Sequence, residues 1–141
     1  MSRPLPVAPP DAPPRPFPLS EQLARGDVMA AACPSRAVLN HLTSRWGVLV
    51  LIALMPGTQR FSDLRRRIGG VSERMLAQTL QALEGDGMVA RRAYPVVPPR
   101  VEYTLTALGE EAAVRVRDLA DWVEGSLPRI EAQRARAAGR G

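Results

Sequence analysis

The chain has 141 residues and a formal net charge of +5, and all 19 of its basic residues are arginine. This length gives room for one domain with its own core, and a single cysteine excludes a disulfide within the chain. The longest apolar run, from Trp46 to Met55, is about half of the roughly 20 residues that cross a bilayer, and no secretory signal opens the sequence. We therefore expect a cytoplasmic protein without a membrane span, whose guanidinium groups favour a nucleic-acid partner.

Prolines divide the chain into two parts. Eight of the fourteen lie within the first 18 residues, where their fixed φ angle and missing N–H donor disfavour helix and central strand. We expect residues 1–19 to form an extended, disordered tail, and residues 20–141 to form one domain whose regular structure begins by Cys33. The tail is interpreted either as a proline-rich docking peptide or as a semi-rigid segment without a partner.

Three helices are predicted before residue 70. Pro34 suits the first turn of one helix. The segment from Trp46 to Met55 is apolar on all sides, which predicts a helix at the buried centre of the domain. Ser62 is placed to cap a third, short helix, on which Leu64 and Ile68 lie one turn apart and face inward. The arginines of this helix then remain outside.

A fourth helix is predicted to begin at Ser72, which suits the N-cap, with Glu73 near the positive end of the helix dipole. At 100° per residue this helix divides into two faces. The apolar face consists of Leu76, Leu80 and Leu83, and the opposite face consists of Arg74, Gln78 and Gln81. Arginine pairs with guanine edges and glutamine with adenine edges, so the polar face favours a helix that reads the major groove of DNA. An ordinary solvated face is the alternative.

A β-hairpin is predicted after this helix, because two segments rich in β-formers, Met88 to Tyr94 and Arg100 to Leu105, follow the helix-terminating glycines. The stiff loop between them consists of Pro95, Val96, Val97, Pro98 and Pro99. The hairpin also carries Arg91, Arg92 and Arg100. It suits a wing that lies along the DNA backbone and directs an arginine toward a narrow minor groove. The alternative is a surface hairpin with incidental charge.

The C-terminal segment predicts a helix capped by Thr106. Its apolar residues recur every three or four positions, with a tryptophan beside the stripe: Leu108, Ala112, Val116, Leu119, Trp122 and Val123. One helix on a small domain needs less apolar surface than this, so we expect the stripe to form a dimer interface. Packing within the protomer is the alternative. Pro128 predicts a kink or a new start of the helix.

Several local sequences resemble the HxlR-type winged helix-turn-helix regulators, which are relatives of the MarR-like repressors. The resemblance covers about residues 33 to 124. It is carried by Cys33-Pro34, Arg45-Trp46, Phe61-Ser62-Asp63-Leu64-Arg65, Ser72-Glu73-Arg74-Met75-Leu76, the helix end from Leu83 to Gly87, and above all Tyr94 to Gly109. It implies a homodimeric bacterial transcription factor that binds inverted-repeat DNA, often under effector control. The proline-rich tail lies outside the family pattern, and Arg45 stands where lysine is commoner.

Cys33 is the residue best suited to covalent chemistry. It precedes a predicted helix start, with Arg36 one turn on, and both the helix dipole and the cation favour the thiolate that oxidants and electrophiles attack. Some members of the family that this chain resembles use a cysteine at this place as a redox or quinone sensor. A small buried thiol is the alternative, and a lone cysteine pairs only across a dimer or with a small thiol.

Together these features predict a mainly α fold with a small β-hairpin wing: a winged helix-turn-helix whose terminal helices form a dimer interface. We expect a homodimeric repressor bound to double-stranded DNA, without a metal or cofactor. The residues expected in the major groove are Ser72, Arg74, Met75, Gln78 and Gln81. Those expected at the backbone or the minor groove are Arg65, Arg66, Arg91, Arg92 and Arg100.

Other classes of function have less support in the sequence. His41 stands on a predicted core helix without a second metal ligand at a suitable spacing, and no phosphate-binding glycine loop occurs, so an enzyme is not expected. Two alternatives to a DNA-bound repressor stay open. One is a sensor of small hydrophobic or aromatic effectors, with a pocket between the dimer helices and the core. The other is a winged helix that binds protein or RNA.

Overall fold

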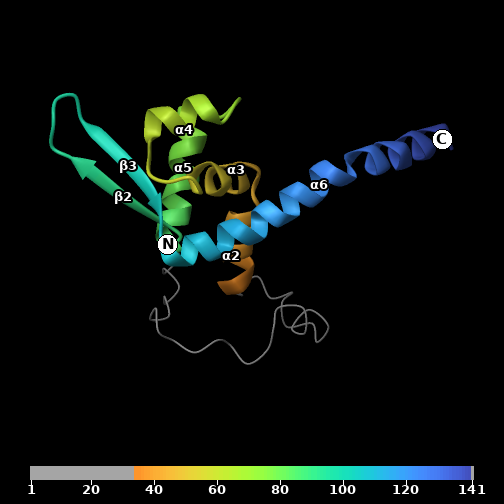
Figure 1. Cartoon of the computed structure of the whole chain (residues 1–141), viewed down its shortest axis with the longest axis horizontal. Helices are drawn as coiled ribbons and strands as arrows, with labels where there is room; N and C mark the ends of the chain where they lie inside the picture. The colour runs from red at the N-terminus through yellow and green to blue at the C-terminus, as the bar shows by residue number, and fades with distance from the viewer. Residues whose placement is uncertain (1–33, 141) are drawn as a thin grey trace, which may run out of the picture.

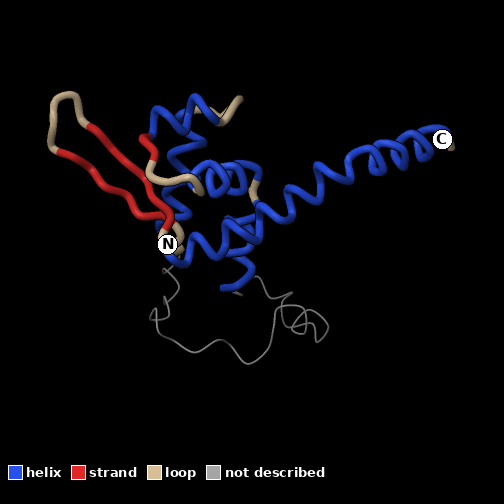
Figure 2. The backbone as a smooth tube through the Cα atoms, in the orientation of Figure 1, coloured by secondary structure: helices blue, strands red, loops and turns tan. Residues whose placement is uncertain are grey.

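The computed structural model describes residues 34–140. Along the chain the elements are α2 (Pro34–Thr43), α3 (Arg45–Leu54), β1 (Gln59–Arg60), α4 (Phe61–Arg67), α5 (Glu73–Gly85), β2 (Val89–Tyr94), β3 (Arg100–Leu105) and α6 (Ala107–Gly139) (Figure 1). The expected fold class is confirmed, since helices dominate and a small antiparallel sheet forms the wing (Figure 2). The predicted tail, the domain start near Ser20 and Cys33 lie outside the described residues.

The core is centred on α3, which contacts both α5 and α6. Val50, Leu51 and Leu54 are almost completely buried in one apolar cluster with the leucines of α5. Burying one such side chain stabilises the fold by about 1.5–3 kcal/mol relative to leaving it in water. The helix is not buried on all sides as its sequence predicts, because Leu49 is 42% exposed. Its neighbours cover only part of its circumference, and Leu49 lines an open hollow near the end of α4.

Ser44 forms the corner between α2 and α3. Its Oγ accepts a hydrogen bond from the backbone N–H of Gly47 (3.1 Å) and caps α3. The two helices are bent by 70° relative to each other. Among residues 34–140, no single helix combines the length and the hydropathy of a membrane span, and this pair reaches them only jointly.

The start of α4 differs from the prediction that Ser62 caps it. The helix begins at Phe61, its N-cap is Arg60 without a side-chain cap, and Ser62 lies inside the first turn. The reason is the short strand β1, which pairs with β3 and holds Arg60 opposite Glu102 in an extended conformation. The strand order β1-β3-β2 therefore delivers the chain directly into α4.

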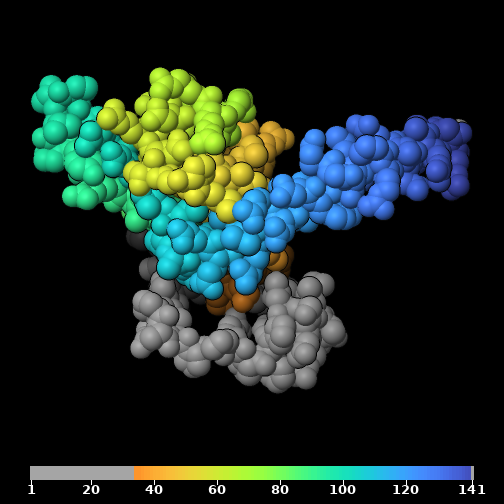
Figure 3. Space-filling model, viewed as in Figure 1, coloured from red at the N-terminus to blue at the C-terminus, as the bar shows by residue number. Residues whose placement is uncertain are grey.

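The long helix α6 begins where Thr106 Oγ1 accepts a hydrogen bond from the N–H of Gly109 (3.0 Å), as the sequence predicts. Gly109 is required there, because a Cβ at this position would collide with the carbonyl of Met88. The helix then continues through Pro128 without the predicted restart. Its C-terminal half extends away from the rest of the described domain (Figures 1 and 3).

Candidate nucleic-acid interface

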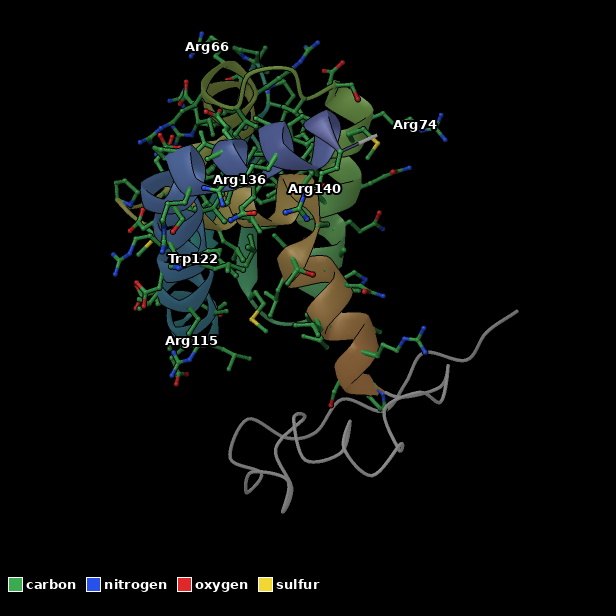
Figure 4. The ribbon with its side chains drawn as sticks, turned by 90° about the vertical axis from the view of Figure 1, so that its right-hand side faces the viewer. Arg66, Arg74, Arg115, Trp122, Arg136 and Arg140 are labelled. Carbon is green, nitrogen blue, oxygen red and sulfur yellow. The ribbon has the colours of Figure 1, made fainter. Side chains whose placement is uncertain are left out.

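Helix α5 turns its two faces in opposite directions. Leu76, Leu80 and Leu83 are buried in the core, whereas the side chains of its polar face are exposed, namely Arg74, Gln78 and Gln81. The Oγ of Ser72 accepts a hydrogen bond from the N–H of Met75 (3.0 Å), so the predicted N-cap is present. In Figure 4, Arg74 points away from the body of the molecule, on the side opposite Arg115 and Trp122 of α6. The polar face is therefore free to meet a large partner.

Met75 lies on the flank of α5 that borders α2. It is exposed, and together with Gln78 it forms one wall of a shallow hollow whose opposite wall includes Asn40 and His41. The hollow has a volume of about 190 Å³. Met75 thus occupies the edge of the exposed face, whereas Arg74 and Gln78 occupy its centre.

The three arginines of α4 have different surroundings. Arg65 lies 3.9 Å from the carboxylate of Glu73, so its charge faces the first turn of α5. Arg66 pairs with Asp63 within its own helix and projects from the upper end of the molecule (Figure 4). Arg67 turns back and donates to the carbonyl of Ala53 near the end of α3 (3.4 Å). All three arginines are exposed, as expected from the sequence, and Arg67 in addition ties α4 to the end of α3 through this hydrogen bond.

The arginines of the wing point to opposite faces of the hairpin, which the sequence interpretation did not separate. Successive residues of a strand alternate between faces. The register places Arg91 opposite the buried Tyr103 and Arg92 opposite Glu102. Arg91 accordingly lines the side that faces α5, whereas Arg92 lies on the outer side together with Tyr94.

A groove of about 530 Å³ separates α5 from the wing. Gln81 and Glu84 line it from the helix, and Arg91 and Tyr103 line it from the strands. The groove therefore joins the exposed face of α5 to the inner face of the hairpin. Gln81 and Arg91 line it from opposite sides, and Glu84 adds one carboxylate.

The outer face of the wing holds a cluster that we name the wing cluster: Arg92, Tyr94, Arg100 and Glu102. The guanidinium carbons of Arg92 and Arg100 lie 4.9 and 4.3 Å from the centroid of the Tyr94 ring. The Tyr94 hydroxyl donates to Glu102 Oε2 (3.1 Å), and Arg100 Nε lies 3.4 Å from Glu102 Oε1. Arg100 is thus folded onto the hairpin. Sequence reasoning missed Tyr94 and Glu102, although the two-residue period of the strands places both on the face of Arg92 and Arg100.

The loop between the strands is the most exposed part of the wing. All five predicted loop residues are exposed, and Val97 is 99% exposed. The loop forms the projecting tip of the hairpin in Figure 1. Between this tip and the start of α4 lies an open cavity of about 610 Å³ lined by Phe61, Ser62 and Val101 among others.

The apolar stripe of α6 divides between the core and the surface. Val116 is buried in the core of its own protomer and Ala112 packs against that core, which corrects the prediction that these two residues belong to the dimer interface. The reason is that α6 uses these small side chains to contact α3. Four residues stay exposed and are named the α6 strip: Leu108, Leu119, Trp122 and Val123. Trp122 is 58% exposed and Leu119 is 52% exposed, so large apolar surfaces lack a partner within the described chain.

His41 has a structural partner. Its Nδ1 lies 2.6 Å from Oδ2 of Asp86, which ties α2 to the end of α5. Within residues 34–140, no three side chains of the histidine, cysteine, aspartate and glutamate types come together as a metal site would require.

Comparison with known proteins gives one consistent family. Residues 41–131 match the HxlR-like helix-turn-helix family. The chain is 65% identical over 116 residues to the uncharacterized HTH-type transcriptional regulator YtfH of Escherichia coli K12, which covers 82% of this chain and 92% of the relative.

Solved structures agree with this result. The structure of ytfH from Salmonella typhimurium is 64% identical, with a TM-score of 0.74, and the match covers 77% of this chain and 96% of that one. The redox regulator HypR in its reduced form is 32% identical, with a TM-score of 0.64, over 71% of this chain and 99% of that one. The chain therefore belongs to the HxlR-like helix-turn-helix family, a family of transcriptional regulators and not of enzymes.

Proposed function

We propose that the protein is a homodimeric repressor that binds an inverted-repeat operator in the cytoplasm, with α5 in the major groove and the wing on the flanking backbone. The observation that carries this proposal is the groove between α5 and β2, where Gln81 and Arg91 face one another beside the exposed Arg74 and Gln78. One continuous surface thus offers groups for base edges and groups for phosphates.

The exposed face of α5 supplies the sequence-reading chemistry of the proposal. Arg74 is suited to bidentate bonds with O6 and N7 of guanine, and the glutamines to N6 and N7 of adenine. Ser72 is at the N-terminal end of the helix, where its N–H-rich first turn faces phosphates. Met75 at the edge of this face is suited to contact with a thymine methyl group.

The backbone contacts of the proposal come from α4 and the wing. Arg65 and Arg66 are exposed beside α5, and Arg91 lines the groove that would hold one strand of the duplex. The exposed proline-rich loop has the shape of a tip for the minor groove, with Arg92 and Arg100 at its base. Phosphate contacts of this kind position a protein on DNA without specifying sequence.

Dimerisation is proposed through the α6 strip, whose large apolar side chains lack a partner within the described chain. A twofold axis through this strip would repeat α5 and the wing on both protomers. Two recognition helices in such a dimer lie about 34 Å apart, one turn of DNA, which is why an inverted repeat is the expected operator.

The experiment that tests the function is sequencing of genomic fragments that the protein retains in vitro. We expect the retained fragments to share an inverted repeat with half-sites one DNA turn apart, and a promoter carrying it to be repressed by the protein. Retention without a shared sequence would contradict the proposal. Binding of RNA or of a protein in place of duplex DNA would support the other winged-helix alternative.

Control by cysteine chemistry is a second level of the proposal, favoured by the similarity to the redox regulator HypR. The sole cysteine, Cys33, directly precedes the first residue of α2 in the sequence. We expect hydrogen peroxide or a quinone to change operator affinity in the wild type and not in Cys33→Ser. If the Cys33 thiol is alkylated at an ordinary rate in the folded protein, control by cysteine chemistry is ruled out. Thermal shifts with aromatic compounds would indicate a small-molecule effector instead.

A further inference from the structure

The wing cluster gathers two cations, one aromatic ring and one carboxylate on a single face of the hairpin. The register places Arg92 directly opposite Glu102 and Tyr94 directly opposite Arg100. Side chains of directly opposite residues on one face lie close enough to interact. Because Tyr94 ends β2 and Arg100 begins β3, the cluster borders the exposed loop from 95 to 99.

Tyr94 is the platform of the cluster. Its ring lies within 5 Å of both guanidinium carbons, at 4.9 Å for Arg92 and 4.3 Å for Arg100, which is the distance of cation–π attraction. Long arginine side chains lose rotamer freedom when they bind, and a ring that already orders them reduces that loss. Tyr94 therefore holds two cations in place beside the tip of the wing.

Glu102 is the counter-charge of the cluster. One of its carboxylate oxygens accepts from the Tyr94 hydroxyl at 3.1 Å, and the other lies 3.4 Å from Nε of Arg100. This Nε atom is buried, and no oxygen is placed to accept a hydrogen bond from it. The carboxylate thus neutralises Arg100 without satisfying its donor. The buried Nε is out of reach of an external anion, but the Arg100 side chain is 36% exposed. A phosphate oxygen would therefore bind the terminal N–H groups of its guanidinium, which prefer such an acceptor.

We propose that Glu102 is an internal competitor of DNA phosphate that limits the affinity of the wing for the backbone, and that Tyr94 is the positioning residue that keeps Arg92 and Arg100 ready for it. This inference rests on the proposed DNA-binding function and deepens it. The side chains of Arg100 and Glu102 are 36% and 22% exposed, so solvent still screens this ion pair in part and an external anion can approach it. A carboxylate at this site weakens phosphate binding on every sequence alike, so it lowers the overall affinity of the protein for DNA and the salt dependence of that affinity.

The test is Glu102→Gln, which keeps the size of the side chain and an acceptor for the Tyr94 hydroxyl. Affinity is measured by fluorescence anisotropy over a salt series, on duplexes with the retained inverted repeat and on random duplexes. We expect about three- to tenfold tighter binding to both duplexes, and a plot of log affinity against log salt that is steeper by about 0.9, the value for one added phosphate contact. Glu111→Gln on α6 makes the same charge change elsewhere and should leave both quantities unchanged.

Two further variants separate this role from simple stiffening of the hairpin. In an Arg100→Gln background, the gain from Glu102→Gln should disappear, because the released cation is no longer there. Tyr94→Leu should weaken binding to both duplexes, opposite in sign to Glu102→Gln. A cluster that only stabilised the hairpin would instead lower affinity in both variants. Thermal unfolding of each variant shows whether the fold is kept.

The possible outcomes are distinct. Weaker or unchanged binding by Glu102→Gln overturns the inference, and so does a gain that persists without Arg100. A wild-type protein that binds no duplex DNA overturns the proposed function together with the inference. A wild type that binds its operator while Glu102→Gln has no effect leaves the function intact and removes only the role of Glu102.

Discussion

Helices α5 and α6 have similar N-caps, but their exposed faces differ in polarity. Each starts at a hydroxyl cap, Ser72 in one and Thr106 in the other, and each is amphipathic. The leucines of α5 are buried in the core, so apart from Met75 at its edge the exposed face of this helix is polar. In α6 the small side chains of Ala113 and Val116 are buried in the core, whereas the larger apolar side chains of the α6 strip are exposed. The exposed polar face of α5 suits DNA, whereas the exposed apolar α6 strip suits a second protein chain. One domain therefore presents two kinds of interface.

Of the substitutions considered, Trp122→Glu in the α6 strip should have the largest effect on DNA binding, through loss of the dimer. A carboxylate in the α6 strip would disfavour the dimer, and operator affinity should fall by about 10²–10⁴-fold because the two half-sites are no longer bound by one linked molecule. Sedimentation equilibrium and operator titration measure both changes. Val114→Glu, an exposed position on the other side of α6, is the matched control. A Trp122→Glu protein that stays dimeric would show that the strip is not the interface.

Leu80→Ala should separate the buried face of α5 from its exposed face. Leu80 is 1% exposed, so its truncation should lower the free energy of unfolding by about 2–5 kcal/mol. Gln78→Ala, on the opposite face, should change it by no more than about 0.5 kcal/mol. Urea denaturation measures both variants. Similar losses from the two substitutions would mean that the division of faces is wrong.

Arg74→Ala tests whether the exposed polar face of α5 contacts bases. We expect a loss of about 1–3 kcal/mol in binding to the operator, with a relaxed base preference and unchanged stability. Arg115→Ala on α6, whose side chain lies on the opposite side of the molecule in Figure 4, is the control. Competition titrations with single-base variants of the operator provide the measurement. Equal losses on operator and random DNA would assign Arg74 to phosphate contact instead.

Arg91→Ala should have the smallest effect and a different character. Arg91 lies on the wing and lines the groove beside α5, where we expect it to contact phosphate and not bases. Its loss should therefore weaken binding to all sequences equally. The salt dependence should become shallower by about 0.9 in log–log slope. Anisotropy titrations at several salt concentrations measure this. A sequence-dependent loss with an unchanged slope would argue for base contact by Arg91.

The sequence predicts the helical part of the interface well because strong periodic signals define it. Leucines at 76, 80 and 83 oppose Arg74 and Gln78 at a helical spacing, and the caps at Ser72 and Thr106 have the residue types that capping requires. These features depend only on neighbours within the same helix. They appear in the structure where the sequence places them.

The differences arise where distant segments decide the local structure. Gln59 and Arg60 are two polar residues without a strand pattern, and they form β1 only because β3 pairs with them. That pairing also moves the start of α4 one residue ahead of Ser62. Which residues of the α6 stripe face the core depends on the position of α3, which periodicity within α6 does not contain.

In the wing, the two-residue alternation of the strands is visible in the sequence, but the partners of each arginine depend on how β2 pairs with β3. The arginines of the hairpin are evident from the sequence, but their partners follow only from the register that sets Arg92 opposite Glu102. A one-residue shift in that register would exchange the two faces of the strand. The separation of Arg91 and Arg92 onto opposite faces of the hairpin is therefore evident only from the structure.

In the proposed complex, α5 binds the major groove twice, once in each half of a symmetric dimer. Dimethyl sulfate protection of guanine N7 on the selected operator tests this arrangement most directly. We predict two protected sets of guanines one helical turn apart, related by the twofold symmetry of the site, and loss of protection in both sets with Arg74→Ala. Protection of a single set, or protection that is unchanged in Arg74→Ala, would show that α5 does not bind DNA in this way.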